Sequence, residues 1–117
     1  MMSQPAIRIR ISLGKLVAIG PGKADLLEMI DQYGSISAAA KQMKMSYRRA
    51  WELVDTMNRC FDEPLVKTSP GGSHGGGAQV TEFGFYILQC YRDLIDKTTM
   101  VAEKELAAIT SHLKSLD

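Results

Sequence analysis

The chain has 117 residues, of which 45% are hydrophobic and 23% charged, and its net charge is +1. A chain of this length makes about one domain, and no segment approaches the roughly 18 apolar residues that span a bilayer. We therefore expect one domain over residues 1–117 with no membrane role. The first residues lack a secretory signal pattern, so we also expect the protein to stay in the cytoplasm.

The N-terminal segment predicts a β-hairpin over residues 7–19. Apolar and polar residues alternate from Ile7 to Leu13, which is the period of a strand with one buried face. A tight turn at Gly14 leads into a second short strand. We interpret Arg8 and Arg10 as the solvated face of the first strand, with a DNA contact as the alternative.

Two helices are predicted to follow in quick succession. The first begins at Pro21, since proline suits the first helical position, and ends at Gly34. The second is capped by Ser35 or Ser37 and carries small alanine side chains in its first turns. Such small residues let neighbouring helices approach each other closely.

A third helix, capped by Ser46, is predicted from Tyr47 to about Phe61 after a turn at Lys44 and Met45. Its apolar face consists of Ala50, Leu53, Val54 and Met57. Its opposite face consists of Arg48, Arg49, Glu52, Thr56 and Arg59. We assign Trp51 to the inner, apolar face with a role in the core, with stacking on a base as the alternative. Two helices joined by a short turn, the second with a basic outer face, indicate a helix-turn-helix over residues 35–61.

Positive charge is concentrated in this middle segment, where the basic residues outnumber the acidic ones. The start of the second helix of a helix-turn-helix meets base edges and phosphates, so the hydroxyls and guanidinium groups of residues 46–49 are candidate DNA contacts. The alternative is a plain helical packing unit whose arginines are only solvated.

Residues 64–80 predict a second hairpin, or wing, whose tip is the glycine-rich segment from Ser69 to Gly77. No Gly-Lys-Ser/Thr sequence ends this segment, which argues against a nucleotide-binding loop. A tip that bends over a DNA backbone explains the same glycines, with Ser69, Ser73 and His74 as phosphate donors. Simple exposure of His74 is the alternative. The complete set of predicted DNA-binding residues is Ser37, Lys44, Ser46, Tyr47, Arg48, Arg49, Glu52, Ser69, Ser73, His74, Gly75 and Gly76.

The last element is predicted to be one long helix over residues 82–115, capped by Thr81. At 1.5 Å per residue it would reach roughly 50 Å, which is more than so small a core can cover. A second copy of the same helix in a twofold dimer would cover the rest. The predicted dimerisation residues are Ile87, Tyr91, Leu94, Thr98, Val101, Ala102, Leu106 and Ile109.

The sequence offers little for catalysis or metal binding. It has two histidines, no Cys/His cluster and no paired carboxylates, so we predict a protein that is not an enzyme and has no metal site. Cys60 and Cys90 lie among apolar residues and are interpreted as small core side chains, with a redox pair as the alternative.

Two strings, SISAAAKQMKMSYRRAWELVDTMN and EPLVKTSPGGSHGGGAQVTEFG, resemble the N-terminal DNA-binding domain of the molybdate-responsive ModE regulators. The specific features are Ser-Tyr-Arg-Arg-Ala-Trp at 46–51, the glycine-rich wing and Thr-X-X-Gly at 81–84. The resemblance covers about residues 7–95. It implies a LysR-like winged helix-turn-helix, a dimer, and regulation of genes for molybdate uptake or molybdenum enzymes. These regulators bind their oxyanion in a separate C-terminal domain, which we expect to be absent here, so no cofactor is predicted and the effector is unknown.

We therefore predict a mainly α fold with a small β component, a winged helix-turn-helix with a long C-terminal dimerisation helix. The predicted function is sequence-specific transcriptional regulation by a homodimer on a pseudo-palindromic operator in double-stranded DNA. The alternatives are a protein-interaction adaptor on the same fold and a regulator that responds to a small molecule at an undetected site.

Overall fold

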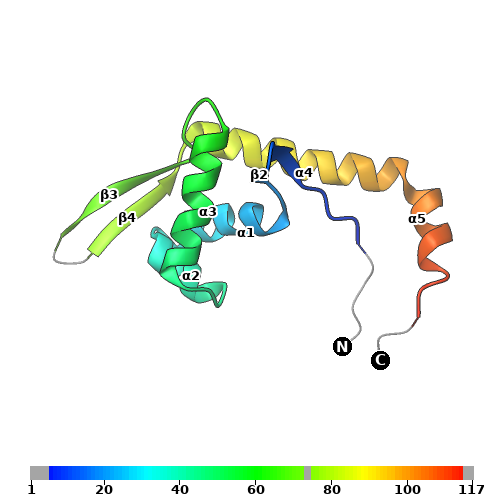
Figure 1. Ribbon diagram of the computed structural model, residues 1–117, viewed down its shortest axis with the longest axis horizontal. Helices are drawn as coiled ribbons and strands as arrows, with labels where there is room; N and C mark the ends of the chain where they lie inside the picture. The colour runs from blue at the N-terminus through cyan, green and yellow to red at the C-terminus, as the bar shows by residue number, and fades with distance from the viewer. Residues whose placement is uncertain (1–5, 73–74, 115–117) are drawn as a thin grey trace.

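The computed structural model describes residues 6–72 and 75–114. A short hairpin of β1 (Ile11–Leu13) and β2 (Leu16–Ile19) comes first, followed by α1 (Pro21–Tyr33), α2 (Ile36–Gln42) and α3 (Tyr47–Cys60). The wing consists of β3 (Val66–Gly72) and β4 (Gly75–Val80), and the chain continues through α4 (Glu82–Val101) into α5 (Glu103–Thr110). Figure 1 shows the wing and α4 extending in opposite directions from the three central helices, in a molecule of 54 × 34 × 25 Å.

The core lies where α1, α2 and α3 meet the base of the wing. Its largest fully buried side chains are Ile19, Leu26, Leu27, Ile30, Met57 and Leu65. Alanines 39, 40 and 50 are also buried, and they allow α2 and α3 to cross closely. This arrangement is a winged helix-turn-helix, which confirms the predicted fold class.

The predicted helix starts are confirmed by their capping hydrogen bonds. The Ser35 hydroxyl accepts from Ala38 N at 3.0 Å, Ser46 accepts from Arg49 N at 3.0 Å, and Thr81 accepts from Gly84 N at 2.9 Å. Gly34 ends α1 at φ 77°, a conformation that favours glycine. These local signals fix where each helix begins and therefore which side chains α3 exposes.

Hydrogen bonds to backbone groups hold the base of the wing against α3 and the end of α1. The Asn58 side chain accepts from Leu65 N at 2.8 Å and donates to Val66 O at 3.0 Å. On the second strand of the wing, Ala78 N donates to Gly34 O at 2.9 Å. The wing therefore stands at a defined angle to α3.

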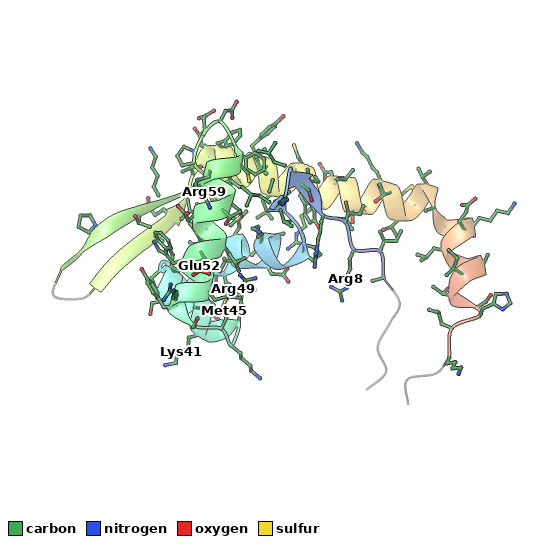
Figure 2. The ribbon with its side chains drawn as sticks, viewed as in Figure 1. Arg8, Lys41, Met45, Arg49, Glu52 and Arg59 are labelled. Atoms are coloured by element: carbon green, nitrogen blue, oxygen red, sulfur yellow. The ribbon has the colours of Figure 1, made fainter. Side chains whose placement is uncertain are left out.

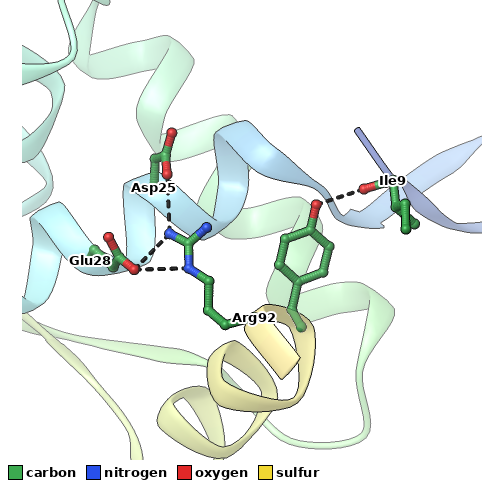
Figure 3. A network of polar contacts seen from close by, with 5 residues as sticks. Ile9, Asp25, Glu28 and Arg92 are labelled. Carbon is green, nitrogen blue, oxygen red and sulfur yellow. Dashed lines mark hydrogen bonds and ion pairs between the residues drawn. The ribbon is translucent and has the colours of Figure 1, made fainter. Parts of the chain in front are cut away.

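Helix α4 is held against the core by polar contacts with α1 and the N-terminal segment (Figure 3). The Arg92 guanidinium contacts Glu28 Oε1 at 2.6 Å and Asp25 Oδ1 at 3.2 Å. The Tyr91 hydroxyl donates to Ile9 O at 2.7 Å, and the side chain is only 3% exposed. No helix in the described part of the chain is long and apolar enough to cross a membrane.

The prediction of one continuous helix over residues 82–115 is wrong. Helix α4 ends at Val101, and Ala102 adopts φ −92° and ψ 11° before α5 begins. Thr98, near this end, donates its hydroxyl back to Leu94 O at 2.7 Å, a contact that often bends helices. Figure 1 shows α5 turning away from the line of α4.

The first predicted strand is also shorter and less buried than expected. β1 starts at Ile11 rather than Ile7, and Ile11 and Leu13 are 42% and 57% exposed. The reason is that β1 pairs only with β2, with a register shift after Ile11, so no other layer covers its apolar face. The interpretation of Cys90 as a core residue is likewise wrong, because its side chain is exposed.

Candidate nucleic-acid interface

Helix α3 presents a ridge of charged side chains to solvent. Arg48 Nε contacts Glu52 Oε1 at 3.2 Å, and Arg59 Nε contacts Asp55 Oδ2 at 3.1 Å, each pair one helical turn apart. The Arg48 side chain is 89% exposed. Exposed pairs of this kind stabilise a helix by only about 0.3–0.5 kcal/mol, so these arginines can exchange partners at little cost.

The helix-turn-helix geometry leads directly to this ridge. Lys44 adopts φ 57° in the four-residue connection between α2 and α3, and its side chain is exposed. The Ser46 hydroxyl is engaged as the cap of α3 and has remaining acceptor capacity. Because the turn and cap fix the start of α3, Tyr47, Arg48 and Arg49 all lie exposed on its first turn.

A first groove, of about 290 Å³, separates α3 from the wing. Ser37, Tyr47 and Trp51 line it from the helices, and Ser69 and Gly76 line it from the wing. Four of these residues were predicted DNA contacts, and the fold brings them to one place although they are far apart in sequence. The groove is lined by hydroxyls, aromatic rings and glycine backbone, with no charged side chain.

The assignment of Trp51 to the core is wrong, since its side chain is 46% exposed in this groove. On a helix of 3.6 residues per turn, Trp51 follows Tyr47 by four positions and therefore shares its flank. That spacing was the available signal, but the large apolar surface of tryptophan pointed to burial.

A second groove, of about 500 Å³, lies on the opposite flank of α3. Arg49 lines it from α3, Arg8 and Arg10 from the N-terminal segment, and Lys23 from α1. Figure 2 shows Arg49 and Arg8 on the side of α3 that faces away from the wing. Sequence reasoning placed Arg49 at the interface and kept a DNA contact of Arg8 and Arg10 as the alternative to a solvated strand face. It missed Lys23, because nothing local relates residues 8, 10, 23 and 49.

Of the remaining predicted wing contacts, Gly75 belongs to the described residues. Gly75 pairs with Gly72 across the end of the hairpin. Ser73 and His74 lie outside the described residues, so their predicted role as phosphate donors stays a prediction.

The predicted dimerisation residues divide into two groups. Tyr91 is wrong as an interface residue because its side chain is buried in the core of its own chain, and Ile87 also packs against that core. Leu94, Thr98 and Leu106 are half-buried, whereas Val101 and Ile109 are 84% and 64% exposed. Ala102 marks the break between α4 and α5. Among the residues that the structure describes, no group of His, Cys, Asp and Glu could hold a metal ion.

No family model matches the chain. It is 38% identical over 97 residues to the transcriptional regulator ModE of Haemophilus influenzae, a match that covers 83% of this chain and 38% of the relative. This relative and the next both carry the name ModE. A second, the molybdenum transport protein ModE of Azotobacter vinelandii, is 46% identical over 77 residues, covering 66% of this chain and 28% of the relative.

A third relative, the DNA-binding transcriptional dual regulator ModE of Escherichia coli K12, is 35% identical over 88 residues, covering 75% of this chain and 34% of the relative. The chain thus spans about a third of the length of the ModE relatives that it matches. Their names describe regulation, transport and DNA binding.

A solved structure also matches the fold. It is the crystal structure of the CbnR_DBD–DNA complex, with a TM-score of 0.56 and 18% sequence identity, covering 75% of this chain and 95% of that one. At this identity the match shows the shared winged-helix fold alone.

Proposed function

We propose that this chain is the DNA-binding part of a ModE-type transcription regulator and reads double-stranded DNA with α3 in the major groove. The observation that carries the proposal is the exposed ridge of α3, with Arg48 and Arg49 at its start, between two grooves. A duplex presents a major groove bordered by two phosphate strands, and a helical ridge flanked by two grooves complements that shape. The proposal requires no cofactor or metal in this chain. It also implies that the protein acts in the cytoplasm, where it binds DNA.

The test compares two double variants that each remove two positive charges. Random-sequence duplexes selected on the wild-type chain supply the probe, and fluorescence anisotropy measures affinity at several salt concentrations. We expect Arg48→Ala/Arg49→Ala to weaken binding at least tenfold, because a single bidentate contact to a base contributes about 1–3 kcal/mol. The control, Lys97→Ala/Lys104→Ala, alters exposed lysines on α4 and α5 and should change affinity less than twofold.

The outcome depends on both variants remaining folded, which thermal melting checks. If the folded Arg48→Ala/Arg49→Ala variant bound the duplex as tightly as the wild type, the proposed role of α3 would be wrong. Binding of the wild type that is absent, or that does not weaken as salt rises, would favour the protein-interaction adaptor, because phosphate contacts release counterions.

We propose in addition that the chain acts as a homodimer through α4 and α5. In support, these helices and the residues that follow them expose several apolar side chains, namely Met100, Val101, Ile109 and Leu113. Burying such surface against a second copy gives a twofold dimer. Its two α3 helices would then read half-sites separated by one or more turns of DNA, which makes the operator pseudo-palindromic.

Sedimentation velocity tests the dimer. Val101→Glu places a charge at the most exposed apolar position of α4 and should shift the chain to monomer, whereas Thr99→Glu, exposed on another face, should not. A wild-type chain that is monomeric at high micromolar concentration would contradict the dimer.

The target genes are proposed from the relatives. Relatives named for molybdenum include the ModE transport protein of Azotobacter vinelandii and the molybdenum-pterin-binding protein MopA of Rhodobacter capsulatus, the latter 43% identical over 86 residues. We therefore expect a genome-wide binding map to show occupancy upstream of genes for molybdenum uptake or use. Occupancy confined to unrelated promoters would contradict this part of the proposal.

A further inference from the structure

The groove between α3 and the start of α1, here called the cationic groove, concentrates positive charge without any counter-charge. Its charged lining residues are Arg8, Arg10, Lys23 and Arg49, and its lining includes no aspartate or glutamate. Like charges held close together repel one another, so four cations around one depression form an arrangement that an anion would stabilise.

Lys23 is the most informative of these residues because it is both charged and buried. Its side chain is only 9% exposed, and no hydrogen bond or ion pair to it occurs among the described residues. Burial lowers the pKa of the Lys23 ammonium, and the charges of Arg49 and Arg10 lower it as well. No buried side-chain nitrogen or oxygen among the described residues lacks a hydrogen-bond partner, so the Lys23 stem is packed while its ammonium reaches the surface of the groove. An ammonium held beside other cations, with no acidic side chain in the groove lining, is a group that an anionic ligand would stabilise.

The N-terminus of α1 opens into the same groove. Its N-cap is Gly20, which provides no side-chain hydrogen bond, and its first turn has no acidic residue. The first intrahelical bond runs from Ala24 N to Gly20 O at 2.9 Å, so the N–H groups of Gly22 and Lys23 precede it. These N–H groups and the positive end of the helix dipole attract anions.

Arg10 is positioned over this helix start. A Cβ built on Gly20 would lie 3.3 Å from Cγ of Arg10, so the aliphatic stem of the arginine packs on the N-cap. Arg10 therefore lines the groove together with Gly22, Lys23 and Arg49.

We propose that the cationic groove binds a phosphate-type oxyanion, held by the Lys23 ammonium and the N–H groups of Gly22 and Lys23, and flanked by Arg10 and Arg49. Two sources share this chemistry, a backbone phosphate of bound DNA and a free inorganic oxyanion. The volume of about 500 Å³ falls in the range of about 300–1,000 Å³ typical of sites for whole organic ligands, which favours a phosphate carried on a larger molecule. For the DNA source, the inference rests on the proposed function.

The first arm of the test uses inorganic phosphate without DNA. Sodium phosphate is titrated into the full chain at constant ionic strength while backbone amide resonances are recorded, with sodium chloride as the reference. We expect saturable shifts at Gly22 and Lys23 that disappear in Lys23→Met and persist in Lys23→Arg. Lys97→Met, at an exposed position of α4, is the matched control and should keep the shifts.

The same variants reveal whether Lys23 serves the fold or a ligand. If the Lys23 side chain stabilises the fold, Lys23→Met should melt at a lower temperature than the wild type. If Lys23 instead serves to bind an anion, the phosphate-free Lys23→Met should melt at a higher temperature than the wild type, because the substitution removes a charge that Arg49 and Arg10 repel. If Lys23→Met fails to fold, the amide shifts of the wild type and Lys23→Arg still decide the matter.

The second arm measures duplex affinity against salt concentration. A plot of log affinity against log salt concentration has a negative slope, and loss of one phosphate contact reduces the magnitude of that slope by about 1. Lys23→Met should show this reduction, and Lys97→Met should not. If Lys23→Met shows the smaller salt slope and free phosphate causes no amide shifts in the wild type, the groove binds the DNA backbone. If free phosphate causes the amide shifts and the salt slope of Lys23→Met is unchanged, the groove binds a free oxyanion. Absence of both overturns the proposal. Failure of the chain to bind any duplex, with the phosphate shifts intact, would reject the proposed function and leave the oxyanion site standing.

Discussion

Gly84 is the position where a single methyl group should separate the wing from α4. A Cβ at this residue would lie 2.3 Å from Leu65 O and 2.7 Å from Val80 Cγ1. The Leu65 carbonyl cannot retreat freely, because it accepts from Thr81 N at 2.9 Å at the start of the same helix. We expect Gly84→Ala to push the start of α4 away from the base of β3.

The size of the effect follows from three contributions. Forcing a methyl into packed structure costs about 1–3 kcal/mol, and a weakened Thr81 hydrogen bond costs about 1 kcal/mol more. Alanine returns about 1 kcal/mol through its better helix propensity. The net destabilisation is about 2 kcal/mol, which for a chain of this length lowers the melting temperature by roughly 6–12 °C.

Gly22 offers a matched control for this experiment. It also lies in the first turn of a helix, but a Cβ there would have nothing within 4 Å. Gly22→Ala should therefore raise the free energy of unfolding by about 0.4–1 kcal/mol. Thermal and urea denaturation of both variants measure the difference. If Gly84→Ala were as stable as Gly22→Ala, the close approach of α4 to the wing base would not be a constraint on the fold.

Three further perturbations probe how the wing and α4 are attached. Asn58→Ala removes the side-chain hydrogen bonds to the base of β3 and should lower the free energy of unfolding by about 2 kcal/mol in urea titrations, with no loss if the wing base is held otherwise. Burial raises the pKa of the Tyr91 hydroxyl. The stability that this hydroxyl contributes is therefore present below its pKa in the unfolded chain and is lost as pH rises through its pKa in the folded chain. Tyr91→Phe should make the free energy of unfolding depend less on pH in that alkaline range, as denaturation at several pH values would show. Arg92→Ala removes the ion pairs to α1 and, since they are exposed, should cost at most about 1 kcal/mol at low salt and less at high salt, which melting at two ionic strengths would reveal.

The parts of the fold that the sequence predicts well are those set by local chemistry. Ser46 and Thr81 cap their helices because a hydroxyl at that position accepts from an N–H three residues later, whatever the rest of the chain does. Gly34 ends α1 for a similarly local reason, its positive φ. The positions of α1, α2 and α3 could therefore be predicted closely, and the exposed start of α3 with them.

The parts that failed depend on which surfaces meet. The spacing within α3 puts Trp51 on the same flank as Tyr47, but whether that flank is buried depends on the space between α3 and the wing. The apolar alternation around Ile11 predicts a buried face, but burial requires a covering layer that the hairpin does not have. The cationic groove could not be predicted because Lys23 joins a cluster of positive charges only in the folded chain, where Arg10 and Arg49 line the same groove.

The difference between the two flanks of α3 leads to a last prediction about how the protein holds DNA. The groove on the wing side has no charged lining residue, so contacts there release few counterions, whereas the cationic groove should account for much of the salt dependence. Trp51→Ala should weaken duplex binding at every salt concentration by a similar factor, because it removes packing and leaves the charge unchanged. Arg10→Gln should instead reduce the salt slope by about 1. Anisotropy titrations across salt concentrations separate the two effects, and a reduced slope in Trp51→Ala with an unchanged slope in Arg10→Gln would reverse the assignment of the flanks.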